Sequence, residues 1–396
     1  MKRLFLFLVL AVFVGSNALA RPDRTENSDI EVYLLTCGPG QELYATWGHT
    51  ALRVKDLNAG TDIVYNWGVF DFSTKHFAWK FAKGRLEYML AYTTYDRFLD
   101  EYIYSNREVI SQRVNLDRQE INTMLMLIQE NLKPENVKYR YDFFYDDCST
   151  RVRDLLENAV GDNLLYPPED IRNQTTFAKE IERFSIRSPW LDFGIDMLMG
   201  REGRKRTTLR DRMFLPDELS KGLSQLVIRR DGLMVPLLAN PVTVVESTAV
   251  WQKTNVMLTP ISVFSFLLII VLILGATLKS KLANNIMDII IFFLFSVLAV
   301  MIFFFNFFTD HIQMRGNMHI LWLSPFVITS LIALILDKEF LWSFRTVFVF
   351  TIIFTALAII LPKLINPAFI PLSLILAVRS LVRGKYPWNP LKLEAI

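Results

Sequence analysis

The stretch YDDCSTRVRDLLENAVG, residues 145–161, decides how the N-terminal part of this chain can fold. Asp146 and Asp147 are typical helix-start residues, apolar side chains follow at helical spacing, and Gly161 is a typical stop. Cys148 therefore lies in the first turn of a predicted helix. There the helix dipole and the free backbone N–H groups stabilise a thiolate, whereas the two neighbouring carboxylates oppose it. The position suits a nucleophile that still needs a base.

The segments before this helix predict a mixed α+β domain. HTALRVKD, residues 49–56, and DIVYNWGVF, residues 62–70, flank the turn-rich sequence LNAGTD and are predicted to form a β-hairpin. Asp117 and Glu120 stand where a capping box would start an amphipathic helix. Further strands are expected at 30–35, 108–115 and 137–145, and helices at 74–84, 95–105 and 116–132.

The chain has four histidines that could serve as the base for Cys148. His76 lies in a predicted helical segment, and His311 and His319 bracket a loop between apolar runs. His49 instead begins a predicted strand, where regular backbone would hold its side chain. A base on a strand and a nucleophile at a helix start form a common Cys–His arrangement. We therefore predict that His49 serves Cys148.

The two cysteines also allow a different interpretation. Cys37 and Cys148 are the only cysteines in 396 residues, so they are the only pair that could form a disulfide. Disulfides are common in exported proteins, and spacing alone cannot decide connectivity. A disulfide, a buried structural role and a catalytic role for Cys148 all remain open at this point.

The N-terminus predicts export from the cytoplasm. Lys2 and Arg3 precede an apolar run at residues 4–14, and Ala18-Leu19-Ala20 matches a cleavage pattern, so residues 1–20 are predicted to be a cleaved signal peptide. The apolar run is too short to span a bilayer. Residues 21–250 are rich in charged and aromatic side chains and are predicted to be one catalytic domain.

Residues 258–382 are predicted to form a five-helix transmembrane domain. The expected spans are 259–278, 286–308, 319–336, 342–361 and 367–381. The basic residues support one orientation, because Lys279, Lys281 and Arg383 fall on one side, whereas the opposite loops carry only Arg315 and Lys363. The catalytic domain is thus expected in the periplasm, the protein in the inner membrane as a multi-pass protein, and residues 383–396 in the cytoplasm.

Composition excludes some classes of function. The net charge is +3, and basic and aromatic residues are not interleaved, so nothing indicates nucleic-acid binding. No metal site is expected, because His311 and His319 are eight residues apart in a loop without a strong third ligand. No cofactor is predicted. The same loop, residues 309–319, gathers His311, Arg315, Asn317 and His319, which are candidate contacts for lipid headgroups; a solvated loop is the alternative.

Three motifs together resemble a known family. They are LLTCGPGQELYATWGHTALRV (residues 34–54), YNWGVFDF (65–72) and YDDCSTRVRDLL (145–156), followed by the five predicted spans. Their order resembles the Lnb-type lipoprotein N-acyltransferases, whose periplasmic domain has a circularly permuted papain-like fold in which His precedes Cys. The resemblance covers essentially the whole mature chain.

The resemblance implies an activity and a set of residues. An acyl chain would pass from a membrane phospholipid, through a thioester on Cys148, to the α-amino group of the lipidated N-terminal cysteine of a diacylated lipoprotein. Cys148 and His49 correspond to the catalytic pair, and Asn66, on the strand after His49, is the candidate third member.

Two other classes of function remain. The same Cys–His pair would serve an envelope cysteine peptidase or amidase acting on peptidoglycan, although five spans are more than such a hydrolase needs. A disulfide-locked binding domain on a membrane anchor is the non-enzymatic alternative.

Overall fold

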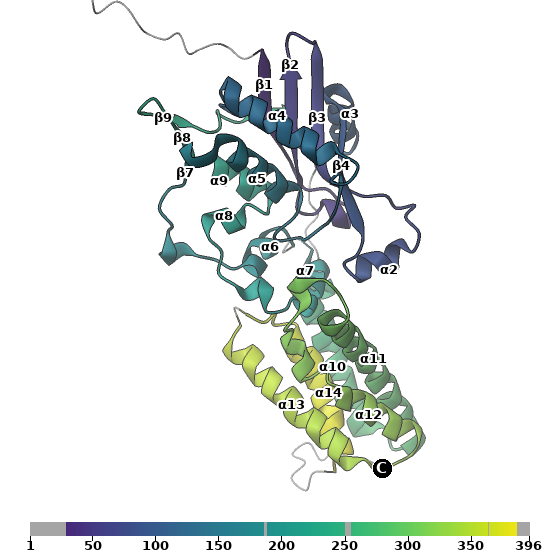
Figure 1. Cartoon of the computed structure of the whole chain (residues 1–396). Helices are drawn as coiled ribbons and strands as arrows, with labels where there is room; N and C mark the ends of the chain where they lie inside the picture. The colour runs from purple at the N-terminus through teal and green to yellow at the C-terminus, as the bar shows by residue number, and fades with distance from the viewer. Residues whose placement is uncertain (1–28, 186–187, 250–254, 363, 386–396) are drawn as a thin grey trace, which may run out of the picture.

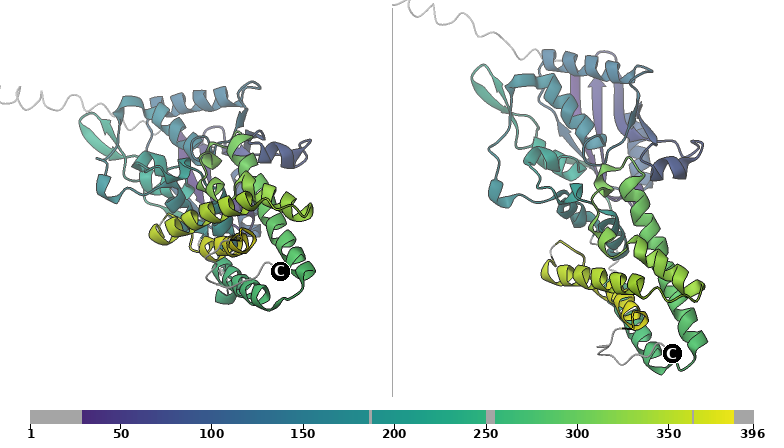
Figure 2. Two further views of the ribbon diagram at one scale, coloured as in Figure 1. Left: turned by 90° about the horizontal axis from the view of Figure 1, so that it is seen from below. Right: turned by 60° about the horizontal axis from the view of Figure 1, so that its bottom comes forward.

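The structure is a computed structural model that describes residues 29–185, 188–249, 255–362 and 364–385 (Figure 1). The predicted signal peptide and most of the predicted cytoplasmic tail lie outside the described residues. A sheet with helices occupies one end of the molecule and a bundle of apolar helices the other, with α6 and α7 between them (Figures 1 and 2). The α+β class of the first part and the helical class of the second are therefore confirmed.

The first part is built on a seven-stranded antiparallel sheet in the order β10-β5-β1-β2-β3-β4-β6. Its strands are β1 (Ile30–Cys37), β2 (His49–Asp56), β3 (Thr61–Val69), β4 (Glu87–Thr94), β5 (Val109–Arg113), β6 (Lys138–Arg140) and β10 (Val242–Val245). The predicted hairpin is confirmed, since β2 pairs with β3 from Asp56–Thr61 to Leu52–Tyr65. β4 was not predicted, and the strand expected at 137–145 is reduced to β6.

Helices cover both faces of this sheet. Helices α4 (Arg118–Leu132) and α5 (Cys148–Val160) pack on one face, and α3 (Tyr95–Tyr104) packs on the other (Figure 1). Alternation along the strands explains this, because successive side chains point to opposite faces. Leu52 contributes to the core under α4 and α5, whereas Ala51 belongs to the core under α3.

The starts of α4 and α5 confirm the helix signals in the sequence. Asp117 and Glu120 form a capping box at α4. At α5 the side chain of Asp147 accepts hydrogen bonds from the backbone N–H groups of Ser149 and Thr150, so Cys148 is the first residue of the helix. Gly161 ends α5, as predicted.

The remaining elements of the first part are short helices and a small second sheet. The helices are α2 (Phe77–Ala82), α6 (Phe177–Ser185), α7 (Pro189–Leu198), α8 (Leu209–Arg212) and α9 (Pro216–Leu223). The second sheet consists of β7 (Leu164–Leu165), β8 (Val227–Arg230) and β9 (Leu233–Pro236).

Five helices form the second part, close to the predicted spans. They are α10 (Pro260–Thr277), α11 (Lys281–Phe307), α12 (Pro325–Ile335), α13 (Leu341–Ile360) and α14 (Phe369–Arg383). Among the described residues, four segments are long and apolar enough to cross a membrane, the third being Met318–Ile335, which adds a short 3-10 turn to α12. Helix α14 has 15 residues, is mostly buried, and packs against α10 and α13. It is short for a span, since a hydrocarbon core of about 30 Å needs about 20 helical residues.

The loop between α11 and α12 joins the two parts. Backbone N–H groups of Asp310 and Gly200 donate across the junction to the carbonyls of Lys83 (2.9 Å) and Gln313 (2.7 Å). Arg85 also pairs with Asp310 at 2.8 Å. Gly200 is required here, because a Cβ would lie only 2.1 Å from the carbonyl oxygen of Arg315. Regular backbone contacts therefore fix the sheet domain on the end of the bundle.

Candidate active site

Cys148 lies where β2 and β3 separate. The pairing of these strands stops at Leu52 and Tyr65, although β2 runs back to His49 and β3 runs on to Val69. Against β4, the register of β3 shifts between Asn66 and Val69. The start of α5 approaches this irregular stretch closely: a Cβ on Gly68 would lie 3.6 Å from Cβ of Cys148.

Gly68 suits this bulge for a second reason. Its φ of +86° lies in the region that side chains disfavour. The bulge is therefore shaped for the close approach of the helix start that carries the thiol.

His49 and Asn66 are held together on the separated strand ends. Nε2 of His49 lies 3.1 Å from Oδ1 of Asn66, while the amide nitrogen of Asn66 donates to the carbonyl of Val64 at 3.5 Å. An amide oxygen only accepts hydrogen bonds, so Nε2 must carry the ring proton when the imidazole is neutral. Nδ1 is then left as the basic nitrogen. The structure thus brings together two predicted site residues and fixes the tautomer of one.

The surroundings keep both members of the Cys–His pair neutral at rest. Burial raises the pKa of the Cys148 thiol, against the opposing effect of hydrogen bonds from the Thr50 backbone N–H, the Ser149 hydroxyl and the N–H groups of the helix start. Burial lowers the pKa of His49 to about 4, despite the hydrogen bond to Asn66. Within the described residues, no hydrogen bond joins the ring to the thiol. Catalytic hydrogen bonds are often long or poorly aligned before substrate binds.

Helix α5 is nevertheless tied to the strand that carries His49. The hydroxyl of Thr50, the residue after His49, lies 2.9 Å from the hydroxyl of Ser149, the residue after Cys148. Both side chains are fully buried, with exposed fractions of 0%. The backbones of the predicted base and nucleophile are therefore held next to each other by a buried hydrogen bond.

Cys37 is not joined to Cys148. Both cysteines are free thiols. Cys37 ends β1, where it is the cross-strand partner of His49, and it lies in the core under α3 with Tyr102. Burial raises the pKa of Cys37 to about 12. The disulfide considered from the sequence is absent from the structure.

Tyr139 is a site residue that the sequence did not reveal. Its hydroxyl is buried and has no hydrogen-bond partner among the described residues. The oxygen is 3.9 Å from the Cβ position of Gly68, the same point that lies 3.6 Å from Cβ of Cys148. The guanidinium of Arg151 stacks over the Tyr139 ring at 3.9 Å and fixes it. This hydroxyl is therefore available to hydrogen-bond a ligand or water beside Cys148.

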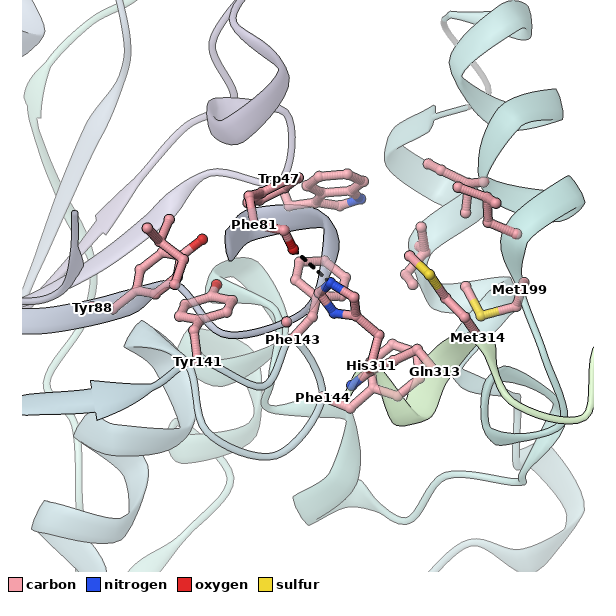
Figure 3. Close-up of a pocket in the computed structure, with 15 residues that line it drawn as sticks. Trp47, Phe81, Tyr88, Tyr141, Phe143, Phe144, Met199, His311, Gln313 and Met314 are labelled. Carbon is pink, nitrogen blue, oxygen red and sulfur yellow. Dashed lines mark hydrogen bonds between the residues drawn. The ribbon is translucent and has the colours of Figure 1, made fainter. Parts of the chain in front are cut away.

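An apolar cavity of about 260 Å³ adjoins this site (Figure 3). It lies at the junction of the sheet domain, α7 and the α11–α12 loop. Its lining consists of Trp47, Phe81, Gly84, Leu86, Tyr88, Tyr141, Phe143, Phe144, Ile181, Ile195, Leu198, Met199, His311, Gln313 and Met314. The Tyr141 ring also lies 3.5 Å from the Cβ position of Gly68, so one wall of the cavity touches the Cys148 site. Only the tertiary structure assembles this lining.

The four predicted headgroup contacts are distributed along the junction. His311 lines the cavity, with Nε2 2.9 Å from the carbonyl of Phe81 (Figure 3). Arg315 donates to the carbonyl of Thr309. Asn317 is buried and donates to the carbonyl of Met197 at 2.8 Å. His319 is buried and accepts from the indole N–H of Trp322 at 3.0 Å. All four polar side chains bond within the protein, so their role toward lipid stays a prediction.

The comparisons with known proteins agree with this architecture. Residues 22–176 match the family model of the Lnb N-terminal periplasmic domain, and residues 252–386 match that of the Lnb transmembrane domain. No curated protein and no solved structure matches the chain. The matched domains and the apolar helices establish a membrane protein with a periplasmic domain.

Proposed function

Because the chain belongs to the Lnb family and carries both Lnb domains in order, we propose that it is a lipoprotein N-acyltransferase of the inner membrane. Its donor is a membrane phospholipid and its acceptor is the α-amino group of a diacylated lipoprotein. Cys148, His49 and Asn66 carry the reaction on the periplasmic side. The five helices hold this domain at the bilayer, where both substrates keep their chains.

One observation carries the proposal. The only thiol at a helix start lies beside a His–Asn pair, and this site is fixed by backbone hydrogen bonds to the end of an apolar helix bundle. A thiol with a base performs acyl transfer. The attachment to the bundle favours an acyl donor and acceptor that stay in the membrane.

The first half-reaction makes the acyl-enzyme. Nδ1 of His49 removes the thiol proton as the sulfur of Cys148 attacks the ester carbonyl of the phospholipid. The developing oxyanion receives hydrogen bonds from the backbone N–H groups around the sulfur and from the hydroxyl of Tyr139. When the C–O bond breaks, the imidazolium returns the proton to the leaving lysophospholipid, and the acyl group remains as a thioester.

The second half-reaction transfers the chain. The neutral α-amine of the lipoprotein attacks the thioester carbonyl, His49 accepts the proton of the amine, and the thiolate of Cys148 leaves and is reprotonated. An amine attacks a thioester more readily than water does. Burial of the site excludes water and protects the intermediate further.

Detection of the acyl-enzyme tests this function. Incubated with phospholipid and no acceptor, the full-length protein should gain the mass of one acyl chain on Cys148, and neutral hydroxylamine should remove it. A diacylated lipopeptide with a free α-amine should then take up the chain, whereas the matched N-acetylated lipopeptide should not. An adduct on any other residue contradicts the proposal. So does transfer by an enzyme that carries no adduct when acceptor is withheld.

A further inference from the structure

We propose that the cavity of Figure 3 holds the acyl chain of the Cys148 thioester, and that Met199 and Met314 at its far end limit the length of that chain. This proposal rests on the proposed function and adds to it a binding site and a basis for substrate selectivity. The ligand is a saturated or unsaturated fatty acyl chain.

The first argument is the position of the two ends of the cavity. Tyr88 and Tyr141 lie at one end, and Met199 and Met314 lie at the other (Figure 3). Tyr141 reaches the Gly68 bulge against which Cys148 packs. A chain bound to the sulfur can therefore enter past Tyr141 and extend toward the two methionines.

The second argument is the chemistry of the walls. The lining is dominated by aromatic and aliphatic side chains, whose rings pack against one another, as Trp47 and Phe143 do edge to face with centroids 5.0 Å apart and Tyr88 and Tyr141 do by stacking at 4.5 Å. The polar groups of His311 and Gln313 are engaged by the carbonyl of Phe81 and the carboxylate of Asp142. The indole N–H of Trp47 is the one buried lining donor without a partner among the described residues, so most polar groups of a sugar or peptide would stay unpaired in this cavity, whereas a hydrocarbon chain has none to pair.

The third argument is the origin of the walls. Trp47 and Tyr141 come from the sheet domain, Ile195 and Leu198 from α7, and Met314 from the loop between α11 and α12. The site is thus complete only when the sheet domain is docked on the apolar bundle. The cavity therefore lies between the domain that carries the thiol and the apolar bundle.

The two methionines give the far end its selectivity. Methionine is flexible and fills irregular apolar space, so a chain that reaches these residues must displace or repack them. A bulkier side chain at either position, such as tryptophan, should shorten the acyl chain that the cavity accepts, and a smaller one, such as alanine, should lengthen it. One extra or missing methylene in an apolar pocket changes rates by about 10-fold to 200-fold.

The test compares thioester loading from phospholipids with decanoyl, myristoyl or stearoyl chains. Met314→Trp should lower the stearoyl-to-decanoyl ratio of loading rates about tenfold or more, and Met314→Ala should raise it. Met199→Trp repeats the test with the second methionine at the same end of the cavity. Met126→Trp is the matched control, since Met126 is exposed on α4, and its ratio should equal that of the unaltered protein.

The outcomes separate the two proposals. If the unaltered protein loads and all Met314 and Met199 variants keep its ratio, the cavity does not hold the chain, while the proposed function stands. A uniform loss with every chain length also overturns the inference, since it marks a structural role. If the unaltered protein loads with none of the three donors, the proposed function and the inference both fail.

Discussion

The end of β1 and the start of α5 each present a buried thiol, and the two thiols lie in opposite kinds of surroundings. Cys37 closes a strand whose neighbours on both sides continue the sheet, and its surroundings hold its pKa at about 12. Cys148 opens a helix, where backbone N–H groups and the Ser149 hydroxyl act against the effect of burial on its pKa. It also adjoins the cavity and the Tyr139 hydroxyl, which has no hydrogen-bond partner in the part of the chain that the structure describes.

The difference shows that position on an element, rather than burial, separates a structural thiol from a reactive one. The exposed fractions are similar, 1% for Cys37 and 8% for Cys148. The Cys148 thiol faces the backbone N–H groups of Thr50 and of Cys148 itself, which can also meet a developing negative charge, whereas those of Ser149 and Thr150 are bound by the Asp147 cap. Cys37 can therefore serve as the control residue in experiments that alter the Cys148 thiol.

The largest effect should come from removing one thiol or the other. Cys148→Ala should lower acyl transfer by a factor of at least about 10⁴, because the reacting group is gone. Cys148→Ser should be nearly as inactive, since a hydroxyl is a far weaker nucleophile with the same base. Cys37→Ala should retain transfer within about threefold and lose about 1–2 kcal/mol of stability through a small core vacancy. Transfer assays with thermal unfolding measure both, and turnover in Cys148→Ala would reverse the assignment.

The next effect concerns the base. His49→Ala should slow thioester loading by about 10²-fold to 10⁴-fold, the usual contribution of a general base. Because His49 pairs with Cys37 in the ladder, circular dichroism must show that the sheet persists. His76→Ala, on a residue that caps the exposed helix α2, is the matched control and should load normally. Equal loading rates for the two variants would remove His49 from the mechanism.

Local signals made part of this site predictable. The acidic residues before Cys148 and the Gly after its helix fixed α5, and the alternation on either side of LNAGTD fixed the hairpin. Asn66 was instead expected from the resemblance to the Lnb-type family, as the candidate third member on the strand after His49. These features depend on neighbours in the chain, so the sequence alone contains the information. The roles of the three residues stay predictions.

The rest depends on contacts between distant segments. β4 is half-exposed, and its central residues 88–92 are all apolar or aromatic rather than alternating, so its pattern does not stand out as a strand, although the sheet needs it between β3 and β6. The sequence does not show that Tyr139 lies near Cys148, because the bulge at Gly68 brings them together. Nor does it show the cavity, which forms only when the α11–α12 loop packs against the sheet domain. That loop was expected to present polar groups to lipid, which stays a prediction, and its hydrogen bonds join the two parts of the molecule.

A smaller effect is expected at Asn66. Asn66→Ala should lower loading about 10-fold to 100-fold, because loss of one buried hydrogen bond frees the His49 ring to take the wrong tautomer. Asn66→Gln, which keeps the amide but displaces it, should recover part of the rate. Stopped-flow loading assays measure this. A rate in Asn66→Ala equal to that of the unaltered protein would show that the hydrogen bond at 3.1 Å has no role in positioning the base.

The smallest effect, and the most specific, is the pH dependence of loading. The pKa of His49 is lowered to about 4, so the neutral base should persist as the pH falls and should be lost only near that value. At pH 5 an imidazole with the ordinary pKa of about 6.5 would be only about 3% neutral, whereas His49 should be about 90% neutral. Loading without acceptor, which avoids the titration of the lipoprotein amine, should therefore stay nearly constant from pH 8 to pH 5. In Asn66→Asp a carboxylate beside Nε2 should stabilise the imidazolium and move the midpoint upward. A midpoint at or above 6.5 in the unaltered protein would contradict the lowered pKa of His49 and would show that its imidazole is not kept neutral by burial.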